Sequence, residues 1–282
     1  MKAVGGIFAT VMFSPIIVVY LIFLLAPIGF FLVMSVFRYS PMELYIPTVT
    51  MENFMRLLGE EHYRSIIFRT LKIAAMTTLF SLLLGYPLAY FLARTVSIWR
   101  GVLMFLVIAP LMTGVIVRTY GWIVLLGSEG TINVTLMWLG MVDRPIKILE
   151  TEIAVLIALI HILMPYMVFP LFSSLASQDP DVEHAAATLG AGRLWIFFEV
   201  TLPLSRAGIL MGSALVFTLT AGAVVTPALL GGTQVQMMGQ AIYDLVLSTL
   251  NWPFASAIAF VLVFCQFSII FLYFKGGRRH VG

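Results

Sequence analysis

Long apolar stretches recur along the whole chain and are separated by short polar ones. Six windows approach or exceed the roughly 20 mostly apolar residues that a membrane-spanning helix needs; they cover residues 11–37, 66–92, 101–126, 151–176, 205–231 and 254–274. Lipid cannot satisfy open backbone groups, and these runs lack the two-residue alternation of barrel strands. The pattern therefore predicts an all-α membrane protein with six transmembrane helices.

Prolines lie within several of these windows, including Pro87, Pro110, Pro165 and Pro170. In a soluble protein they would end the helices, whereas a membrane helix tolerates proline as a kink because neighbouring groups satisfy the freed carbonyls. We therefore expect bent helices, as around a transport passage.

The composition agrees with a membrane domain. Of the 282 residues, 61% are hydrophobic and 10% are charged, whereas about a quarter are charged in soluble domains. No polar block is long enough for a soluble catalytic domain, so we expect a single transmembrane domain over residues 1–282. The one cysteine, Cys265, excludes an intrachain disulfide and a cysteine-based metal site. The small, scattered net charge of +3 gives no indication of nucleic-acid binding.

Six spans would place both termini on one side of the membrane. Lys and Arg are equally numerous in the loops of the two sides, so the positive-inside rule does not decide the orientation by itself. The acid-free tail with Lys275, Arg278 and Arg279, and the short loop with Arg94 and Arg100, favour cytoplasmic termini.

On the other side, residues 38–65 contain an amphipathic stretch that suits the membrane surface, an external partner or a solvated loop. Residues 129–152 predict a short interfacial or re-entrant helix and a turn.

A short polar helix is predicted between the fourth and fifth windows. Asp179 is a good N-cap, Pro180 suits the first helical position, and Asp181 and Glu183 place negative charge where the helix dipole favours it. Three alanines with high helix propensity follow, and Gly190 ends the helix after two or three turns.

A second interfacial helix follows, anchored by Trp195, Phe197 and Phe198, and Pro203 marks the entrance to the fifth span. Residues 177–205 thus predict a helix, an elbow and a helix on the membrane surface. From the residues alone, two interpretations stay open: a surface where another protein docks, or an ordinary capped loop helix.

This loop resembles the EAA loop of permease subunits of binding-protein-dependent ATP-binding-cassette (ABC) importers. His184, Ala185 and Ala186 precede Gly190 with the family's spacing, and Leu202-Pro203 follow. In that family the loop carries the coupling helix, which rests in a cleft of the cytoplasmic ATPase. The resemblance implies that the ATPase-docking residues are Asp181, Glu183, His184, Ala185, Ala186, Ala187, Gly190, Ala191 and Pro203.

Four further segments resemble the spermidine/putrescine permease subfamily: residues 85–93, 118–122, 163–171 and 251–255. The resemblance implies a multi-pass subunit of the bacterial inner membrane with the six-helix permease fold, which forms the passage for a polyamine. It also implies three partners: a cytoplasmic ATPase dimer, a second homologous permease subunit and an extracytoplasmic solute-binding protein. ATP and Mg²⁺ would then bind the ATPase, with no cofactor or enzymatic activity in this chain, which also lacks a Walker A pattern.

The chain departs from the family at one position of the loop. The glutamate of the EAA motif falls at His184, and the acid lies one residue earlier, at Glu183. One residue rotates a side chain by about 100° around a helix, so Glu183 cannot simply make the same contact. Docking is then made differently or more weakly, or His184 makes coupling sensitive to pH.

A polyamine passage needs carboxylates and aromatic faces for cation–π contact. Candidates near the outer halves or ends of the spans are Tyr120, Trp122, Tyr166, Tyr243 and Asp244. The alternative is that they are residues of the membrane interface or of helix packing.

Two other charged or titratable positions in the spans leave alternatives open. Arg118 suits a passage for an anion, or bonds helix-end carbonyls or snorkels outward; His161 suits a neutral core hydrogen bond or a proton relay. Other solutes for such an importer are an opine, an aminophosphonate or ferric ion.

A secondary transporter working without ATP would need buried coupling acids, which the middles of these six windows lack. The scattered histidines have no metal-ligand spacing.

Overall fold

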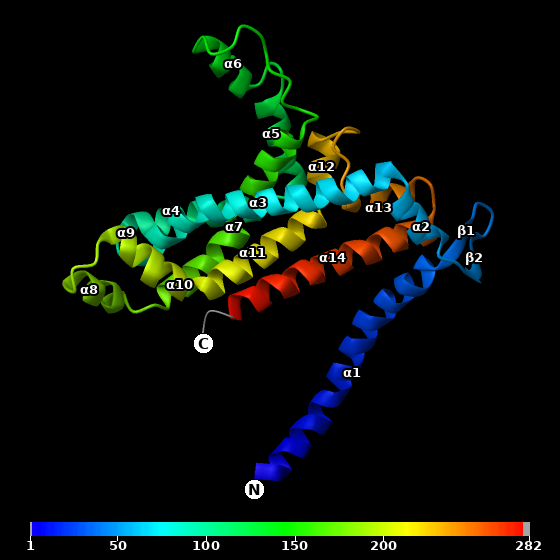
Figure 1. Cartoon of the computed structure of the whole chain (residues 1–282), viewed down its shortest axis with the longest axis horizontal. Helices are drawn as coiled ribbons and strands as arrows, with labels where there is room; N and C mark the ends of the chain where they lie inside the picture. The colour runs from blue at the N-terminus through cyan, green and yellow to red at the C-terminus, as the bar shows by residue number, and fades with distance from the viewer. Residues whose placement is uncertain (1, 279–282) are drawn as a thin grey trace. The chain divides into compact units, whose positions relative to one another are not determined.

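The computed structural model describes residues 2–278, with side chains for residues 13–14, 18–271 and 275. Arg279 and the side chain of Arg278, from the predicted basic tail, therefore lie outside the described part. The elements in chain order (Figure 1) are α1 Lys2–Ser35, β1 Phe37–Ser40, β2 Leu44–Val49, α2 Glu52–Gly59, α3 Glu61–Arg94, α4 Ile98–Ile108, η1 Ala109–Met112, α5 Val115–Leu126, α6 Thr131–Trp138, α7 Glu152–Ala176, α8 Pro180–Thr188, α9 Arg193–Ile196, η2 Phe197–Thr201, α10 Leu202–Leu204, α11 Arg206–Ala221, α12 Val225–Leu230, α13 Met238–Leu247 and α14 Trp252–Arg278.

Four continuous helices in the described residues are long and apolar enough to cross a membrane: α3, α7, and the stretches Val18–Ser35 of α1 and Trp252–Phe271 of α14. Two bent pairs bring the number of candidate spans to as many as 6. The pairs are Ile98–Met112 with Val115–Trp138, bent by 102°, and Arg193–Leu204 with Arg206–Ala221, bent by 66°. The predicted helical membrane fold is thus confirmed.

The third predicted window, residues 101–126, is not one continuous helix. Its chain leaves α4 at Ile108, passes through the 3₁₀ turn η1 with Pro110, and begins α5 only after Gly114. Proline removes a backbone donor and glycine has no side chain to favour the helix. By contrast Pro87, Pro165 and Pro170 lie inside α3 and α7 without ending them, as expected for membrane helices.

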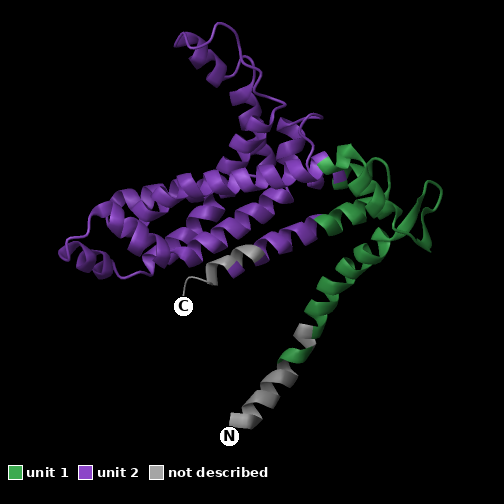
Figure 2. Ribbon diagram, viewed as in Figure 1, with its two compact units in different colours: residues 1–64, 242–261 green, residues 65–241, 262–282 purple. Residues whose placement is uncertain are grey.

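The chain divides into two compact units (Figure 2). Unit 1 comprises Met1–Arg64 and Ile242–Val261, and unit 2 comprises Ser65–Ala241 and Leu262–Gly282. Unit 1 contains an antiparallel hairpin of β1 and β2, which the all-α prediction omitted. The Asn53 side-chain amide of α2 donates to the carbonyls of Ser35 (2.9 Å) and Phe37 (2.8 Å) and so fixes the start of the hairpin.

The core of unit 2 is built around α7, whose buried side chains include Val155, Leu159 and Met167. Helix α11 packs along it through Gly208 and Gly212, which lie one turn apart on the same face. A Cβ atom at Gly208 would lie 2.6 Å from the Pro170 carbonyl oxygen, so only glycine permits this approach of the two helices. Small residues at such spacing are typical of helix contacts in membranes.

Candidate functional site

Helix α8 begins and ends where its sequence predicts. The Asp179 carboxylate accepts a hydrogen bond from the backbone N–H of Asp181 (3.0 Å) and caps the helix, with Pro180 at its first position. At the other end Gly190 has φ +87°, a conformation that glycine adopts without a steric penalty. The Ala191 N–H then reaches the Ala186 carbonyl at 3.1 Å, which satisfies an otherwise open helix carbonyl.

None of the nine residues of α8 is buried, although the helix has an inner and an outer face. The side chains of Asp181 and His184 are 88% and 77% exposed and lie 3.5 Å apart. Ala185 is also exposed, while Glu183 and Ala186 are half-buried. The exposed face therefore carries polar and small side chains together with Val182, and the half-buried Glu183 and Ala186 mark the side that faces the rest of unit 2.

The segment after α8 follows the predicted helix, elbow and helix. Gly190 and Ala191 lie in the elbow, α9 begins at Arg193, and Pro203 lies in α10 at the approach to α11. A hollow of about 610 Å³ lies between α8 and the segment formed by α9 and η2. Its lining residues are Tyr90, Glu183, His184, Ala187, Arg193, Leu194, Ile196, Phe197 and Thr201.

Glu183 makes the densest set of polar contacts in this region. Its Oε1 accepts from Arg94 Nη2 at 2.7 Å and from Thr201 Oγ1 at 3.1 Å, and its Oε2 accepts from the Tyr90 hydroxyl at 3.2 Å. The side chains of Arg94 and Glu183 are both only 16% exposed. Glu183 therefore faces into the protein, whereas the adjacent His184 faces out.

These contacts also set the pKa of Glu183. Burial of the carboxyl raises the pKa, but the hydrogen bond and charge of Arg94, with the hydroxyls of Thr201 and Tyr90, together outweigh burial. The pKa of Glu183 consequently lies below its ordinary value, and the carboxylate is charged at neutral pH.

The three partners of Glu183 were not among the predicted site residues. Arg94 entered the sequence argument only as a loop charge, and Tyr90 and Thr201 did not enter it as site residues. They come from the last turn of α3 and from η2, and the Arg94–Glu183 pair spans 89 residues of sequence. No local pattern indicates such a pairing.

The predicted passage residues are distributed over both units. Tyr120 and Trp122 lie on α5 and Tyr166 on α7, all in unit 2, whereas Tyr243 and Asp244 lie on α13 in unit 1. The side chains of Tyr120, Tyr166 and Tyr243 are exposed, at 55%, 39% and 53%. Their assignment to a passage stays a prediction.

Two polar residues of the spans make structural contacts. Arg118 Nη1 donates to the Ile162 carbonyl of α7 at 3.3 Å. The sequence left open a bond to helix-end carbonyls, whereas this carbonyl lies inside the helix. Trp122 Nε1 donates to His161 Nδ1 at 3.3 Å, so the predicted passage residue Trp122 is paired with α7.

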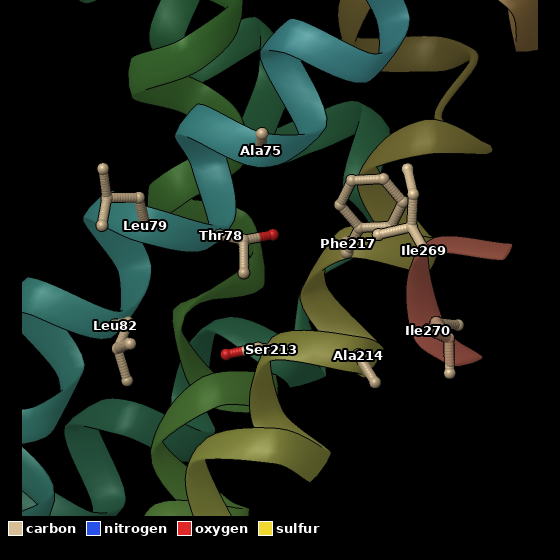
Figure 3. A pocket seen from close by; sticks show the side chains of 9 residues that line it. All are labelled: Ala75, Thr78, Leu79, Leu82, Ser213, Ala214, Phe217, Ile269 and Ile270. Carbon is tan, nitrogen blue, oxygen red and sulfur yellow. The ribbon is translucent and has the colours of Figure 1, made fainter. Parts of the chain in front are cut away.

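A further hollow of about 270 Å³ lies between α3, α11 and α14 (Figure 3). Its only side-chain polar atoms are the hydroxyls of Thr78 and Ser213, and Thr78 already donates to the Ala74 carbonyl. It offers no charge to an ionic solute, since its lining is Ala75, Thr78, Leu79, Leu82, Ser213, Ala214, Phe217, Ile269 and Ile270.

The spans and the exposed loop helix define a multi-pass helical protein of the transporter class. The chain belongs to the family described as binding-protein-dependent transport system inner membrane component, whose model matches residues 81–275. It is thus the inner-membrane permease subunit of an ABC importer and not itself an enzyme; in this family ATP binds the partner ATPase.

Relatives from several bacteria carry the printed name spermidine/putrescine transport system permease protein PotB. The chain is 34% identical to that of Haemophilus influenzae over 278 residues, which is 99% of this chain and 97% of the relative. It is 36% identical to that of Escherichia coli K12 over 229 residues, covering 81% and 83% of the two chains. A crystal structure of a bacterial alginate ABC importer has the same fold, with a TM-score of 0.76, 19% identity and full coverage of both chains.

Proposed function

We propose that this chain is the permease subunit of a polyamine importer that takes up spermidine, putrescine or a related small charged solute. The observation that carries this proposal is the 34% identity to a named spermidine/putrescine permease over 99% of the chain.

The working assembly would contain this chain, a second homologous permease subunit, a cytoplasmic ATPase dimer and an extracytoplasmic solute-binding protein. Both termini and α8 would lie on the cytoplasmic side. A loaded receptor would dock outside, and closure of the ATPase on ATP would move the permease between outward-facing and inward-facing states.

The element that would receive this movement is α8, with the elbow that follows it. Its support is physical: it is capped at both ends, its outer face carries the exposed Asp181, His184 and Ala185, and none of its residues is buried. The small Ala185 side chain allows a partner's backbone to approach closely. Glu183 would not take part in that contact, because its carboxylate is bonded inside unit 2.

For the solute, the proposed passage residues remain Tyr120, Trp122 and Tyr166 of unit 2, with Tyr243 and Asp244 of unit 1. Aromatic faces bind a polyamine ammonium by cation–π attraction of about 0.5–2 kcal/mol each. A carboxylate such as Asp244 would add the charge that aromatic rings lack.

Reconstitution of the full assembly in proteoliposomes tests the substrate. We expect uptake of labelled spermidine that requires ATP and the receptor, and that putrescine competes away while an opine, an aminophosphonate or ferric ion does not. A receptor that binds only one of those other solutes would overturn the polyamine assignment and leave the importer family intact. Uptake without nucleotide would instead favour a secondary transporter.

A bulky substitution on the outer face of α8 tests docking. Ala185→Trp should reduce ATP-driven uptake by about tenfold, because overpacking a close contact costs about 1–3 kcal/mol. The matched control is Val96→Trp, at a side chain that is 99% exposed in the loop between α3 and α4. Equal uptake by the two variants would reject α8 as the docking helix.

A further inference from the structure

Arg94 joins the last turn of α3 to three other parts of unit 2. Its Nη2 binds Glu183 Oε1 of α8 at 2.7 Å and lies 3.5 Å from the Gln178 side-chain oxygen of the linker. Its Nη1 donates to the Leu175 carbonyl in the last turn of α7 at 3.1 Å. One guanidinium therefore spans the end of α7, the linker and α8.

Apart from this contact, α8 is joined to α7 by the short linker Ser177–Asp179 and, through the elbow, packs on α9 and η2. A linker of that kind can act as a hinge, because few φ/ψ changes there would swing a short exposed helix. Glu183 removes this freedom by binding α3 and, through Thr201 Oγ1 at 3.1 Å, the π-helix η2. Both oxygens of its carboxylate are used.

The start of α7 is also joined to α3 by charge, about two to three turns after α3 begins. Lys72 Nζ lies 2.6 Å from Glu152 Oε2, and Arg69 Nε lies 3.4 Å from Glu152 Oε1. Polar bonds thus join α3 to the first and last turns of α7, and between them the Met167 side chain of α7 approaches Gly85, where a Cβ atom would lie 3.2 Å from Met167 Cγ. A displacement of the last turn of α3, which carries Arg94, would therefore move α3 and α7 together.

We propose that Arg94 and Glu183 are positioning residues for transport: their ion pair locks α8 onto the end of α3, so that displacement of α8 by the ATPase moves α3 and α7 as one body. This inference rests on the proposed coupling role of α8. It also accounts for the acid at 183 beside the histidine at 184: the acid holds the helix from inside, and the docking surface lies on the opposite side.

The test measures solute imported per ATP hydrolysed by the reconstituted complex. Glu183→Gln keeps the side-chain shape and removes the charge; we expect assembly and ATP hydrolysis to persist, with import per ATP reduced by at least about fivefold, the lower end of typical coupling between sites. The matched control is Glu199→Gln, an exposed carboxylate on η2, for which the ratio should not change. An unchanged ratio in Glu183→Gln would overturn the inference.

Arg94→Gln and the double variant decide whether the two residues act as a pair. If they do, the double variant should lose less than the product of the two single losses, because the shared Arg94–Glu183 bond can be lost only once. Multiplied losses would show independent effects and overturn the inference. Should Glu183→Gln fail to assemble, Tyr90→Phe removes only the hydroxyl that donates to Glu183 Oε2, and import per ATP should fall by about twofold. An unchanged ratio there would also overturn it.

Ala185→Trp separates this inference from the proposed function. If Ala185→Trp abolishes coupled uptake and Glu183→Gln does not, α8 is the docking helix and the ion pair does not position it. If Ala185→Trp has no effect on uptake, the docking role of α8 fails, and the positioning role fails with it.

Discussion

Glu183 and His184 are adjacent residues with opposite surroundings. The carboxylate of Glu183 is bonded to Arg94 and is 16% exposed, whereas the side chain of His184 is 77% exposed and lies 3.5 Å from Asp181. The rotation of about 100° between successive residues of a helix accounts for this difference. The sequence argument that Glu183 cannot replace a glutamate at position 184 therefore agrees with the geometry, while the docking contact of His184 stays a prediction.

The lowered pKa of Glu183 predicts how the contribution of this carboxylate to folding stability depends on pH. In the unfolded chain Glu183 takes up a proton near its ordinary pKa of about 4.3, and in the folded chain only at lower pH. Between the two values the unfolded state binds more protons, so acid favours unfolding. The stabilisation is complete above the ordinary pKa and is lost as pH falls through the lowered one.

Thermal unfolding of purified wild-type and Glu183→Gln protein checks this. At neutral pH the variant should be less stable by about 1–3 kcal/mol, the usual cost of losing one partner of a buried hydrogen bond. The difference should shrink as the pH is lowered below about 4. Glu199→Gln should show no such pH-dependent difference, and a difference that grows in acid for Glu183→Gln would contradict the assigned charge state.

At the level of the elements, local signals explain α8 well and the broken spans poorly. Asp179 and Gly190 each act within a few residues, so the cap and the end of α8 are readable from sequence. A proline in an apolar run permits either a kink or a break, and α7 and the α4–α5 segment realise these two outcomes. The hairpin of unit 1 was missed because Pro47 lies within β2, and a proline inside a run argues against a strand.

The packing of α11 on α7 leads to a prediction for one methyl group. In Gly208→Ala the new Cβ would lie 2.6 Å from the Pro170 carbonyl oxygen and 2.7 Å from Ser174 Cβ, which forces the helices apart at a cost of about 1–3 kcal/mol. Gly101→Ala on α4 is the control, because nothing lies within 4 Å of its Cβ; it should gain about 0.5–1 kcal/mol. Thermal unfolding should therefore move in opposite directions, and equal shifts would contradict the packing.

At the level of the whole molecule, the sequence predicts the membrane class and most span positions because about 20 apolar residues suffice to identify a span. Only part of the candidate site can be predicted from the sequence. Its helix follows from local capping, but the Arg94–Glu183 pair depends on tertiary contact across 89 residues. The residues of the passage are the hardest to predict from sequence, since an aromatic residue in a span serves helix packing, the membrane interface or solute binding equally well.

The proposed orientation, with both termini in the cytoplasm, is open to a direct labelling test. In a Cys265→Ala background, single cysteines replace two highly exposed residues: Met42, 96% exposed in the hairpin turn, and Val96, 99% exposed in the loop after α3. An odd number of spans separates these loops in the six-span prediction, so they lie on opposite sides. With cytoplasmic termini, a membrane-impermeant maleimide should label Met42→Cys in intact spheroplasts and Val96→Cys only in inverted vesicles. The reverse pattern would place α8 outside, away from any cytoplasmic ATPase, and would reject its coupling role.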